Sequence, residues 1–579
     1  MKQIKNIDKY LFYFLVFLYP LFFLPLFPNF FETPKLLLIS FLVLLIILIK
    51  IIKSFFSNEI IFKTSIFDFF VICFMVANIA STSMLKTGIM DGILLPGTMS
   101  FVLFGALLYI VVNQLTNIEK KQLSLVIVLS AIVFAIVQLL SFTGIVQKNF
   151  VTFGNFPVSL MFLVISLTIS IRDLIKYKNI GFKSFFAVSS FIIFISTFTL
   201  FYLLLPNKIT SSILPSIKTS WSVTTDSLKQ NPFFGVGPGN FILSYSKFRP
   251  ITENSNSSWN LKFTTGANSW FTILSESGIV GFLSLALLFA FFIYFSKSAI
   301  ITILLAITLI LPFTPSFFPI IFLIFAMETE TKEVNGKFSS KLPLLIVLIL
   351  PFVIVLTALT FGIYKVFYPE YLFGQAMKHI TKDDANSTYQ SINKAIKINP
   401  YVDRYHLAAS EIEIAIAEVI ASKEDVSDED KVTIANLIQQ SINEGKSAVS
   451  VANTKVSNWE SLGDLYVKIS PSVKDSADFA IQTYSQAIFL NPIDPNLRIK
   501  LGNVYFGQKK YSEAIKSFEL AVLAKPNLAN AHFSLGQALK ENGQEDKAKL
   551  QFEATLSLLD INSEEYQTVK KEIDLLNKQ

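Results

Sequence analysis

Cysteine and charged residues are both scarce in this chain. A single cysteine among 579 residues excludes a disulfide framework and any cysteine-based zinc or iron–sulfur site. Only 16% of the residues are charged, against about 25% in ordinary soluble domains, and 52% are hydrophobic. A soluble chain this apolar would precipitate, and a disordered chain needs the opposite composition. The composition therefore indicates a large membrane-embedded part.

The few charges divide the chain in two. Residues 1–366 carry 26 basic and 13 acidic side chains, whereas residues 367–579 carry 23 basic and 29 acidic ones. The isoelectric point of about 9.0 thus does not come from one basic face, and we expect no nucleic acid partner. We predict a polytopic membrane domain over 1–366 and a separate polar domain over 367–579.

Apolar runs fill the basic part, and most are long enough to cross a bilayer core of ~30 Å as helices. The runs are 10–27, 36–49, 66–85, 99–115, 123–140, 157–171, 185–205, 279–295, 300–311, 317–327 and 342–366. The ninth and tenth are short and interrupted by prolines, so they form a pair of spans, a re-entrant hairpin or one kinked element. We predict an all-α protein with about 11 transmembrane spans.

Basic residues in the connecting segments predict the orientation of the spans. They cluster before the first run and after the second, fourth, sixth, eighth and tenth, whereas the alternate short segments hold only Lys35, Lys86 and Lys148. The N-terminus of a multi-pass cytoplasmic (inner) membrane protein is therefore expected in the cytoplasm. An odd number of spans places the loop 206–268 and the polar domain outside.

The polar domain repeats itself with a spacing of 34 residues. The motif Leu-Gly-x-x-Tyr at 501–505 recurs as Leu-Gly-x-x-Leu at 535–539. This pattern resembles a tetratricopeptide array, an α-solenoid covering roughly 370–560. In such an array, small residues such as Gly502 lie where helices cross and large ones such as Phe518 fill the gaps. The array is either a docking surface for a partner or a rigid spacer.

All three histidines of the chain lie in this domain, at His379, His406 and His532. They are scattered along the sequence, which favours surface or packing positions over a metal site. We predict no metal centre.

The loop 206–268 carries the candidate chemistry. Its six basic and two acidic residues suit a lipid-linked phosphate or pyrophosphate at the outer leaflet, or merely anionic headgroups. The glycine motif at 235–239 does not indicate a dinucleotide site, because no strand precedes it and Asn240 takes the place of the third glycine. Gly237 and Gly239 more simply permit a tight backbone turn packed on the membrane surface.

The order of these motifs resembles the O-antigen ligase and O-antigen polymerase superfamily over residues 1–366. A helix with Trp221 precedes Asn-Pro-x-x-Gly-x-Gly-x-Gly-Asn-Phe at 231–241, and a basic–aromatic stretch follows. Ala267-Asn268 then follows, and nine residues separate Asn268 from Gly278, which opens a span. Thr-Phe-Gly-Asn at 152–155 is similar to a second segment of these proteins, some of which also carry a tetratricopeptide-type tail.

The resemblance implies transfer or polymerisation of a polyprenyl-pyrophosphate-linked glycan at the outer face of the membrane, without metal, nucleotide or other cofactor. Basic side chains would stabilise the leaving pyrophosphate, and a histidine before the late span would be the base of a ligase. That histidine aligns with Ala267, and residues 1–366 contain no histidine. The chain is then a divergent or polymerase-like transferase, a transferase with a different acceptor, or a protein that has lost catalysis.

The rest of the loop and its neighbours supply the candidate site. The candidate substrate-binding residues are Arg249, Lys247, Lys218, Lys148, Asn268, Gly237 and Gly239, and the candidate catalytic bases are Glu276, Asp226 and Glu253. Arg249 is the first choice for the carrier, because its planar fork binds phosphate in a way that lysine cannot reproduce. Glu276 lies near the end of a span, where an ionisable group is costly and therefore often functional.

The favoured hypothesis expects three kinds of partner: a lipid-linked oligosaccharide, membrane lipid, and a protein or acceptor bound by the repeats. It also predicts that Arg249, Lys218 and Lys148 converge on one cavity. The second hypothesis is a catalytically inactive, membrane-anchored tetratricopeptide scaffold for surface-polysaccharide assembly, which the alanine at 267 supports. The third is a transporter or flippase, against which the scarcity of charges inside the spans argues.

Overall fold

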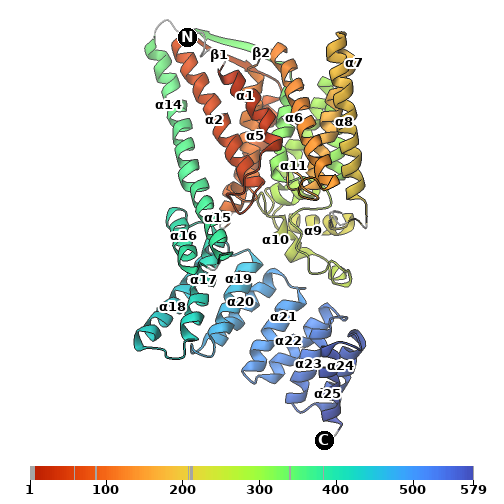
Figure 1. Cartoon of the computed structure of the whole chain (residues 1–579), viewed down its shortest axis with the longest axis vertical. Helices are drawn as coiled ribbons and strands as arrows, with labels where there is room; N and C mark the ends of the chain where they lie inside the picture. Colours follow the sequence, from red (N-terminus) through yellow and green to blue (C-terminus); the bar gives the residue numbers. More distant parts are fainter. Residues whose placement is uncertain are drawn as a thin grey trace. The chain divides into compact units, whose positions relative to one another are not determined.

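The computed structural model describes residues 7–57, 59–84, 88–115, 117–206, 208, 213–337, 341–382 and 384–577 (Figure 1). Lys86, used above to predict orientation, lies outside these residues. The chain divides into two compact units. Unit 1 comprises Met1–Phe241 and Phe263–Asn399, and unit 2 comprises Ile242–Lys262 and Pro400–Gln579. The middle of the predicted outer loop thus packs with the polar domain.

Unit 1 is built from helices and one small sheet. The helices are α1 Ile7–Leu18, η2 Tyr19–Leu21, α2 Glu32–Ser57, α3 Asp68–Ser83, α4 Ile89–Ile93, α5 Thr98–Asn113, α6 Asn117–Thr143, α7 Phe156–Lys176, α8 Ile180–Leu204, α9 Ile217–Gln230, α11 Ser269–Ser296, α12 Ala299–Ile310, η4 Pro315–Phe317, α13 Phe318–Met327, α14 Lys341–Phe361, the π-helical turn η5 Gly362–Phe367, α15 Tyr368–Ile380 and α16 Ala385–Ile398. Helix α10, Phe241–Phe248, begins at the last residue of the first segment of unit 1 and continues into unit 2.

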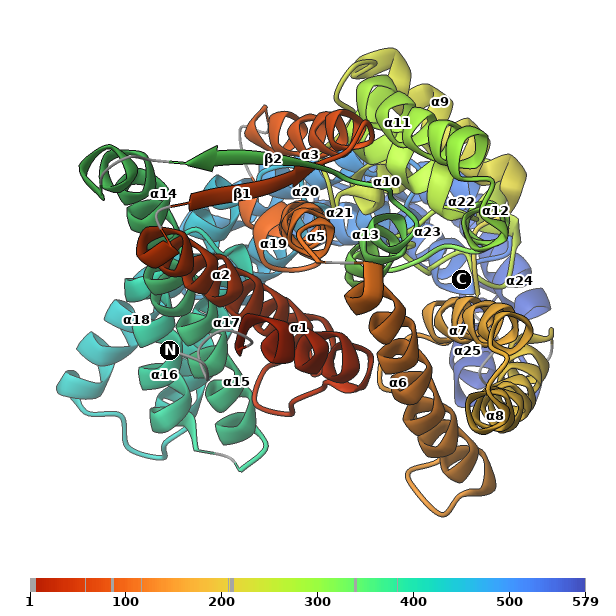
Figure 2. The ribbon, with the colours of Figure 1, turned by 90° about the horizontal axis from the view of Figure 1, so that it is seen from above.

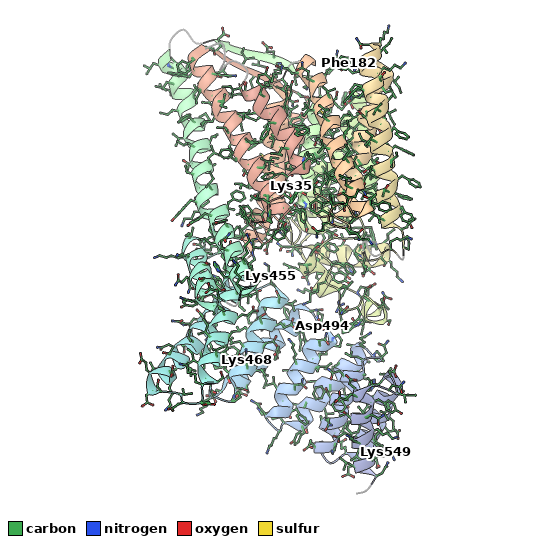
Figure 3. The ribbon with its side chains drawn as sticks, viewed as in Figure 1. Lys35, Phe182, Lys455, Lys468, Asp494 and Lys549 are labelled. Atoms are coloured by element: carbon green, nitrogen blue, oxygen red, sulfur yellow. The ribbon has the colours of Figure 1, made fainter. Side chains whose placement is uncertain are left out.

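Among the described residues, seven helical stretches are long and apolar enough to cross a membrane. They are Glu32–Ser57, Ile89–Asn113, Glu119–Thr143, Phe156–Lys176, Ile180–Leu204, Ser269–Ser296 and Leu342–Ile380, with shorter apolar helices at Asp68–Ser83, Ala299–Ile310 and Pro315–Met327. Helix α8 exposes Phe182, Phe191 and Phe198, and α14 exposes Ile346 and Leu350 (Figure 3). Helices with this much exposed apolar surface are typical of membrane spans.

The two short runs that the sequence left ambiguous are separate helices, α12 and α13. The end of α12 lies beside the start of α11, because the Asn268 side-chain amide donates to the Leu309 carbonyl at 2.9 Å. The chain then turns, and the Tyr19 hydroxyl donates to the carbonyl of Ser316 before α13 begins. Two separate helices joined by a proline-containing turn exclude the single kinked element and agree with either a pair of spans or a re-entrant hairpin.

Charged side chains near the ends of α1, α2, α6 and α7 contact distant parts of unit 1. The end of α2 leads directly into the small sheet (Figure 1). Lys53 Nζ lies 2.6 Å from the Asp8 carboxylate, and Arg172 Nη1 lies 2.6 Å from that of Glu328. Lys120 Nζ donates to the carbonyls of Ala326, in the last turn of α13, and Thr329, just after it, at 2.8 and 2.7 Å. The segments that the charge pattern assigned to the same side of a membrane therefore lie together.

The small sheet joins two of these segments, which the sequence treated as loops. Strand β1, Glu59–Thr64, pairs antiparallel with β2, Lys332–Lys337. Seen from above, the sheet lies between α2 and α3 (Figure 2). Lys63 fixes it to the end of α5, since its backbone N donates to the Gln114 side chain and its Nζ to the Leu115 carbonyl.

Unit 2 contains the repeat array. Its helices are α17 Asp403–Ala421, α18 Asp428–Val451, α19 Val456–Ile469, α20 Ser476–Leu490, α21 Pro495–Gly507, α22 Tyr511–Ala524, α23 Ala529–Glu541, α24 Glu545–Leu558 and α25 Glu564–Leu576, with the 3-10 turn η3 Ile251–Ser255 in the outer-loop segment. Apart from the β1–β2 sheet, the described chain is all-α, as predicted, and ends in tetratricopeptide-like helical repeats.

Glycines set the close packing within each repeat. A Cβ on Gly502 would lie 2.5 Å from the ring of Phe518, and one on Gly536 would lie 2.6 Å from the ring of Phe552. Gly463 has the same relation to the Tyr484 ring, also at 2.6 Å. In three successive repeats a glycine of the first helix thus lies against an aromatic ring of the second, and the predicted close crossing at Gly502 is confirmed.

Two of the three histidines have structural positions that the repeat spacing explains. His406 Nε2 lies 2.9 Å from the Pro400 carbonyl, and His532 Nε2 lies 2.8 Å from the Pro526 carbonyl, six residues earlier in each case. Arg498 makes the same contact with the carbonyl of Pro492. Each side chain thus satisfies a carbonyl at the turn that precedes its helix. Among the described residues, no group of three metal-ligating side chains occurs.

Candidate functional site

The glycine-rich turn after α9 is joined to α11 by backbone hydrogen bonds. Helix α11 is kinked at Gly278, whose φ of 64° and ψ of −166° are not helical. The backbone N of Val236 donates to the Ser275 carbonyl at 3.0 Å, and that of Ile279 donates to the Pro232 carbonyl at 2.9 Å. The kink therefore releases backbone groups of α11 to pair with the turn.

Glycine is required in this junction because the two backbones touch. A Cβ on Gly235 would lie 2.3 Å from a carbonyl oxygen of α11, and one on Gly278 would lie 2.4 Å from the carbonyl oxygen of Phe233. Gly237 and Gly239 have φ of 93° and 86°, which favour glycine. The predicted tight turn is confirmed, and its cause is the close approach of α11. Whether it packs on a membrane surface stays a prediction.

The three candidate bases have different surroundings. Glu253 lies in η3, and its Oε2 accepts a hydrogen bond from Asn256 Nδ2 at 3.1 Å. Glu276 is only 5% exposed, and its Oε1 accepts a hydrogen bond from the backbone N of Phe241, the first residue of α10, at 3.1 Å. This carboxylate holds the start of α10 beside α11. Asp226 lies on the exposed side of α9, 2.7 Å from Lys229 Nζ. Their roles as bases stay predictions.

Asn268 caps α11 and so has a structural position. Its Oδ1 accepts hydrogen bonds from the backbone N of Trp270 and of Phe271 at 3.0 and 3.1 Å. The preceding Ala267 donates its backbone N–H to Ser220 Oγ on α9 at 2.9 Å. The spacing from Asn268 to Gly278 is thus the distance along one helix from its cap to its kink.

Lys148 and Lys218 are exposed in unit 1, Lys148 in the connection after α6 and Lys218 in the first turn of α9. Neither lines the two cavities described below. Their convergence with Arg249, which belongs to unit 2, stays a prediction.

Arg249 is the predicted site residue with the most unusual environment. It is only 6% exposed, and its Nη1 donates to the Trp259 carbonyl at 2.6 Å. The guanidinium carbon lies 5.9 Å from the centre of the Tyr245 ring. No carboxylate among the described residues forms an ion pair with it. Lys247, two residues earlier, instead lies 5.4 Å from the centre of the Phe489 ring.

The segment that carries Arg249 is bound to the repeats through Asn254 and Lys525. The Asn254 amide donates to the carbonyls of Ile493 and Ala524 at 2.8 and 2.9 Å. In return Lys525 Nζ donates to the Asn254 carbonyl at 2.7 Å and lies 4.8 Å from the centre of the Trp259 ring. Since Asn254 is 2% exposed, these bonds are shielded from water.

A polar cavity of about 190 Å³ lies between this segment and the repeats, within unit 2. It is lined by Tyr245, Ser246, Arg249, Trp259, Asn260, Leu261, Lys262, Glu460, Asn491, Asp494 and Asn496. The volume is more than ten times the ~15 Å³ that a single water needs. The cavity is therefore large enough for a small polar molecule.

The acidic side chains of the cavity already have partners. Glu460 Oε1 lies 2.9 Å from Lys500 Nζ, and its Oε2 lies 3.7 Å from Lys262 Nζ. Asp494 is the N-cap of α21 and accepts from the backbone N of Asn496 at 3.0 Å (Figure 3). The sequence Asp-Pro at the start of α21 is a strong helix-initiation signal, which explains this position. Neither carboxylate forms an ion pair with Arg249, although both line the same cavity.

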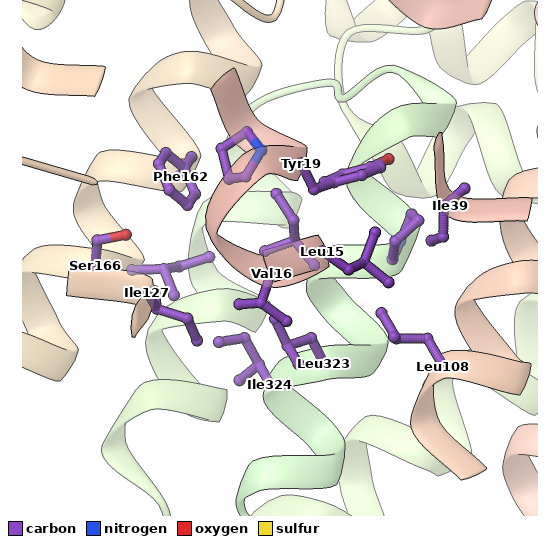
Figure 4. A pocket seen from close by; sticks show the side chains of 14 residues that line it. Leu15, Val16, Tyr19, Ile39, Leu108, Ile127, Phe162, Ser166, Leu323 and Ile324 are labelled. Carbon is purple, nitrogen blue, oxygen red and sulfur yellow. The ribbon is translucent and has the colours of Figure 1, made fainter. Parts of the chain in front are cut away.

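A second cavity, within unit 1, is apolar and small (Figure 4). Its volume is about 20 Å³, room for little more than one water. Leu15 and Val16 of α1, Ile39 of α2 and Phe162 of α7 are among its lining residues. It does not suit a polar substrate.

Sequence reasoning found Arg249 but missed the repeat side of its cavity. Asn491, Asp494 and Asn496 belong to a turn that the repeat pattern identifies only as a helix boundary. Glu460 follows a tryptophan that the repeat pattern treats as packing. Nothing in the sequence indicates that a segment more than two hundred residues earlier lies against them.

Comparison with known proteins identifies the repeats. A family model described as a TPR (tetratricopeptide) repeat matches residues 502–543, which confirms the predicted repeats there. No curated protein matches the chain. Among solved structures, the MamA protein is 23% identical over 33% of this chain and 91% of that chain, with a TM-score of 0.27. A MamA fragment from Desulfovibrio magneticus RS-1 is 12% identical over 33% and 94%, with a TM-score of 0.26. YrrB, described as a TPR protein with an unusual peptide-binding site, is 13% identical over 35% and 91%, with a TM-score of 0.27.

Proposed function

We propose that this chain is a multi-pass membrane protein that transfers or polymerises a polyprenyl-pyrophosphate-linked glycan at the outer face of the cytoplasmic membrane. The exposed apolar side chains of α8 and α14 support the membrane part. The gathering of basic connecting segments at one end of unit 1 supports a cytoplasmic N-terminus. The resemblance to the O-antigen ligase and polymerase superfamily supplies the reaction.

The observation that carries the transfer proposal is the buried guanidinium of Arg249, which lines a polar cavity and forms no ion pair with a carboxylate of the described residues. Taking a charge out of water costs several kcal/mol unless a partner of opposite charge is present. An anion in the cavity would supply that partner, and the fork of arginine suits the oxygens of a phosphate group. Lys262 lines the same cavity, where its Nζ lies 3.7 Å from Glu460 Oε2.

In the proposed reaction, an acceptor hydroxyl attacks the anomeric carbon of the donor sugar. The bond from that carbon to the pyrophosphate oxygen breaks, and polyprenyl pyrophosphate leaves with the bonding electrons. Arg249 stabilises the charge that develops on this leaving group. The acceptor proton passes to a base, for which the sequence offers Asp226, Glu253 and Glu276, because Ala267 cannot serve.

A second candidate function is a catalytically inactive, membrane-anchored scaffold for surface-polysaccharide assembly. Two observations favour it: the alanine at the position of the ligase histidine, and the match of residues 502–543 to a TPR repeat. In this function the repeats bind a protein partner and Arg249 has no catalytic role.

Binding of inorganic pyrophosphate to the full-length protein in lipid nanodiscs, measured by calorimetry, tests the anion site. Arg249→Met removes charge-assisted hydrogen bonds of about 1.5–3 kcal/mol and should weaken binding about 10- to 100-fold. Lys229→Met is the matched control, since it removes an exposed cation of the same loop that is paired with Asp226. Equal affinity of wild type and Arg249→Met would remove Arg249 from the site.

Complementation separates the two functions. In a strain that lacks its surface-glycan ligase or polymerase, the wild-type gene should restore glycan length or attachment, and Arg249→Met should not. If both restore the glycan equally, the scaffold is the better explanation.

A further inference from the structure

The cavity at Arg249 has a second wall, which the repeats supply. Glu460 comes from α19, and Asn491, Asp494 and Asn496 come from the turn between α20 and α21. None of these positions is a basic residue, so this wall has a different chemistry from the Arg249 and Lys262 side. The contacts of Asn254 with the repeat carbonyls hold the two walls together.

The polar atoms of the repeat wall suit hydroxyl groups. Carboxylates offer acceptor sites, while primary amides both donate and accept, so together they match a hydroxyl, which does both. Asp494 receives hydrogen bonds from Asn491 Nδ2 and the backbone N of Asn496, each at 3.0 Å, and retains lone pairs for further donors. Its charge is partly offset by these donors.

Asn491 gives the second, independent observation. Its side chain is 2% exposed, and its Oδ1 has no hydrogen-bond partner among the described residues. A buried amide oxygen without a donor is uncommon and calls for an explanation, of which a ligand donor is one. Asn491 lines the cavity, so a hydroxyl bound there would supply the missing donor.

We infer that the repeat domain recognises the sugar itself, and that the cavity binds one monosaccharide unit bearing a phosphate or carboxylate group. Arg249 takes the anionic group, and Asn491, Asp494 and Asn496 take the ring hydroxyls. The inference rests on the proposed function and extends it, because the repeats then help to select the substrate. The anionic group has two sources, the pyrophosphate of a lipid-linked sugar or the carboxylate of a uronic acid.

Calorimetry with the full-length protein in nanodiscs tests this with four probes: inorganic phosphate, glucose 1-phosphate, glucuronate and glucose. We expect glucose 1-phosphate or glucuronate to bind more tightly than inorganic phosphate or glucose. Whichever of the two binds more tightly identifies the source of the anionic group.

Two variants test whether the tighter binding of the preferred sugar probe comes from the repeat wall of the cavity. Asp494→Asn keeps a good helix cap, and Asn496→Ala removes an exposed side chain while its backbone stays bonded to Asp494. Each should weaken binding of the preferred sugar probe about two- to tenfold, the effect of one hydrogen bond, with inorganic phosphate unaffected. Asp475→Asn, the same change outside the cavity, is the control.

The outcomes separate this inference from the proposed function. If phosphate and the sugar probes bind equally and neither repeat variant matters, the inference is wrong, while anion binding at Arg249 stands. If no anionic probe binds, the proposed function and the inference both fail. If Arg249→Met abolishes binding of every anionic probe and the repeat variants reduce only sugar binding, both are supported.

Discussion

The contact between Gly502 and Phe518 allows a quantitative test of how the repeats pack. A methyl group on residue 502 would lie 2.5–2.8 Å from three carbons of the Phe518 ring, which is 1% exposed and unable to move into solvent. Overpacking of this kind costs about 1–3 kcal/mol, and the better helix propensity of alanine returns about 1 kcal/mol. Gly502→Ala should therefore destabilise the α21–α22 pair by about 0–2 kcal/mol.

The double variant is the sharper test. Phe518→Ala alone should cost about 3–5 kcal/mol because it leaves a cavity. In that background the methyl group of Gly502→Ala fits the vacated space, so it stabilises by its helix propensity and by about 0.8 kcal/mol of burial. The two substitutions should thus couple favourably by roughly 2–4 kcal/mol.

Hydrogen exchange of peptides from α21 and α22 in the full-length protein measures these free energies of local opening. Gly507→Ala, in the same helix but with no atom within 4 Å of its added Cβ, should be neutral or stabilising. Additive effects of Gly502→Ala and Phe518→Ala would refute the packing argument. The equivalent pair in the next repeat, Gly536 and Phe552, should show the same coupling.

Two further predictions concern the kink of α11 and the pH dependence of the α17–α18 pair. Gly278→Ala should lower the thermal unfolding temperature in detergent more than Gly144→Ala, because both have positive φ but only Gly278 meets a backbone atom; equal losses would contradict this. Burial raises the pKa of Glu413 to about 8, with the nearby Glu444 charge adding to the rise. Burial alone would lower the pKa of His406, but its hydrogen bonds to Glu444 and to a backbone carbonyl raise it above 6.5. Because folding raises both pKa values, the protonated forms of these two side chains stabilise the folded state. This stabilisation is lost as the pH rises through the pKa values of the folded protein. Exchange protection of α17 and α18 should fall from pH 6 to 9, and Glu413→Gln should reduce that fall; protection that stays level would refute the assignment.

Features set by local sequence were predictable. The apolar runs predicted helices because a membrane-spanning helix satisfies its own backbone and needs only length and apolar composition. The repeat spacing predicted a close helix crossing at Gly502 and a gap-filling role for Phe518, because the same two positions recur one repeat later. The contact between these two residues emerged only from the structure. The glycine turn was predictable as a turn, although its partner α11 was not.

Features set by contacts between distant segments were not predictable. Strand β1 pairs with β2 across more than two hundred and fifty residues, and neither segment has an alternating apolar pattern that would indicate a strand. Asn254 is an ordinary loop residue in the sequence, and only the fold places it against two repeat carbonyls. Glu276 attracted attention as a buried charge, but its hydrogen bond to the start of α10 gives it a structural task.

The path of the backbone between the two units has a consequence for how this protein can be taken apart. The chain enters unit 2 at Ile242, returns to unit 1 at Phe263, and enters unit 2 again at Pro400. A protease cut before Pro400 would therefore leave the repeats held by the stretch around Asn254. Exchanging the C-terminal part for that of another protein would likewise remove the repeat residues that line the cavity at Arg249. The repeats are therefore not a detachable module.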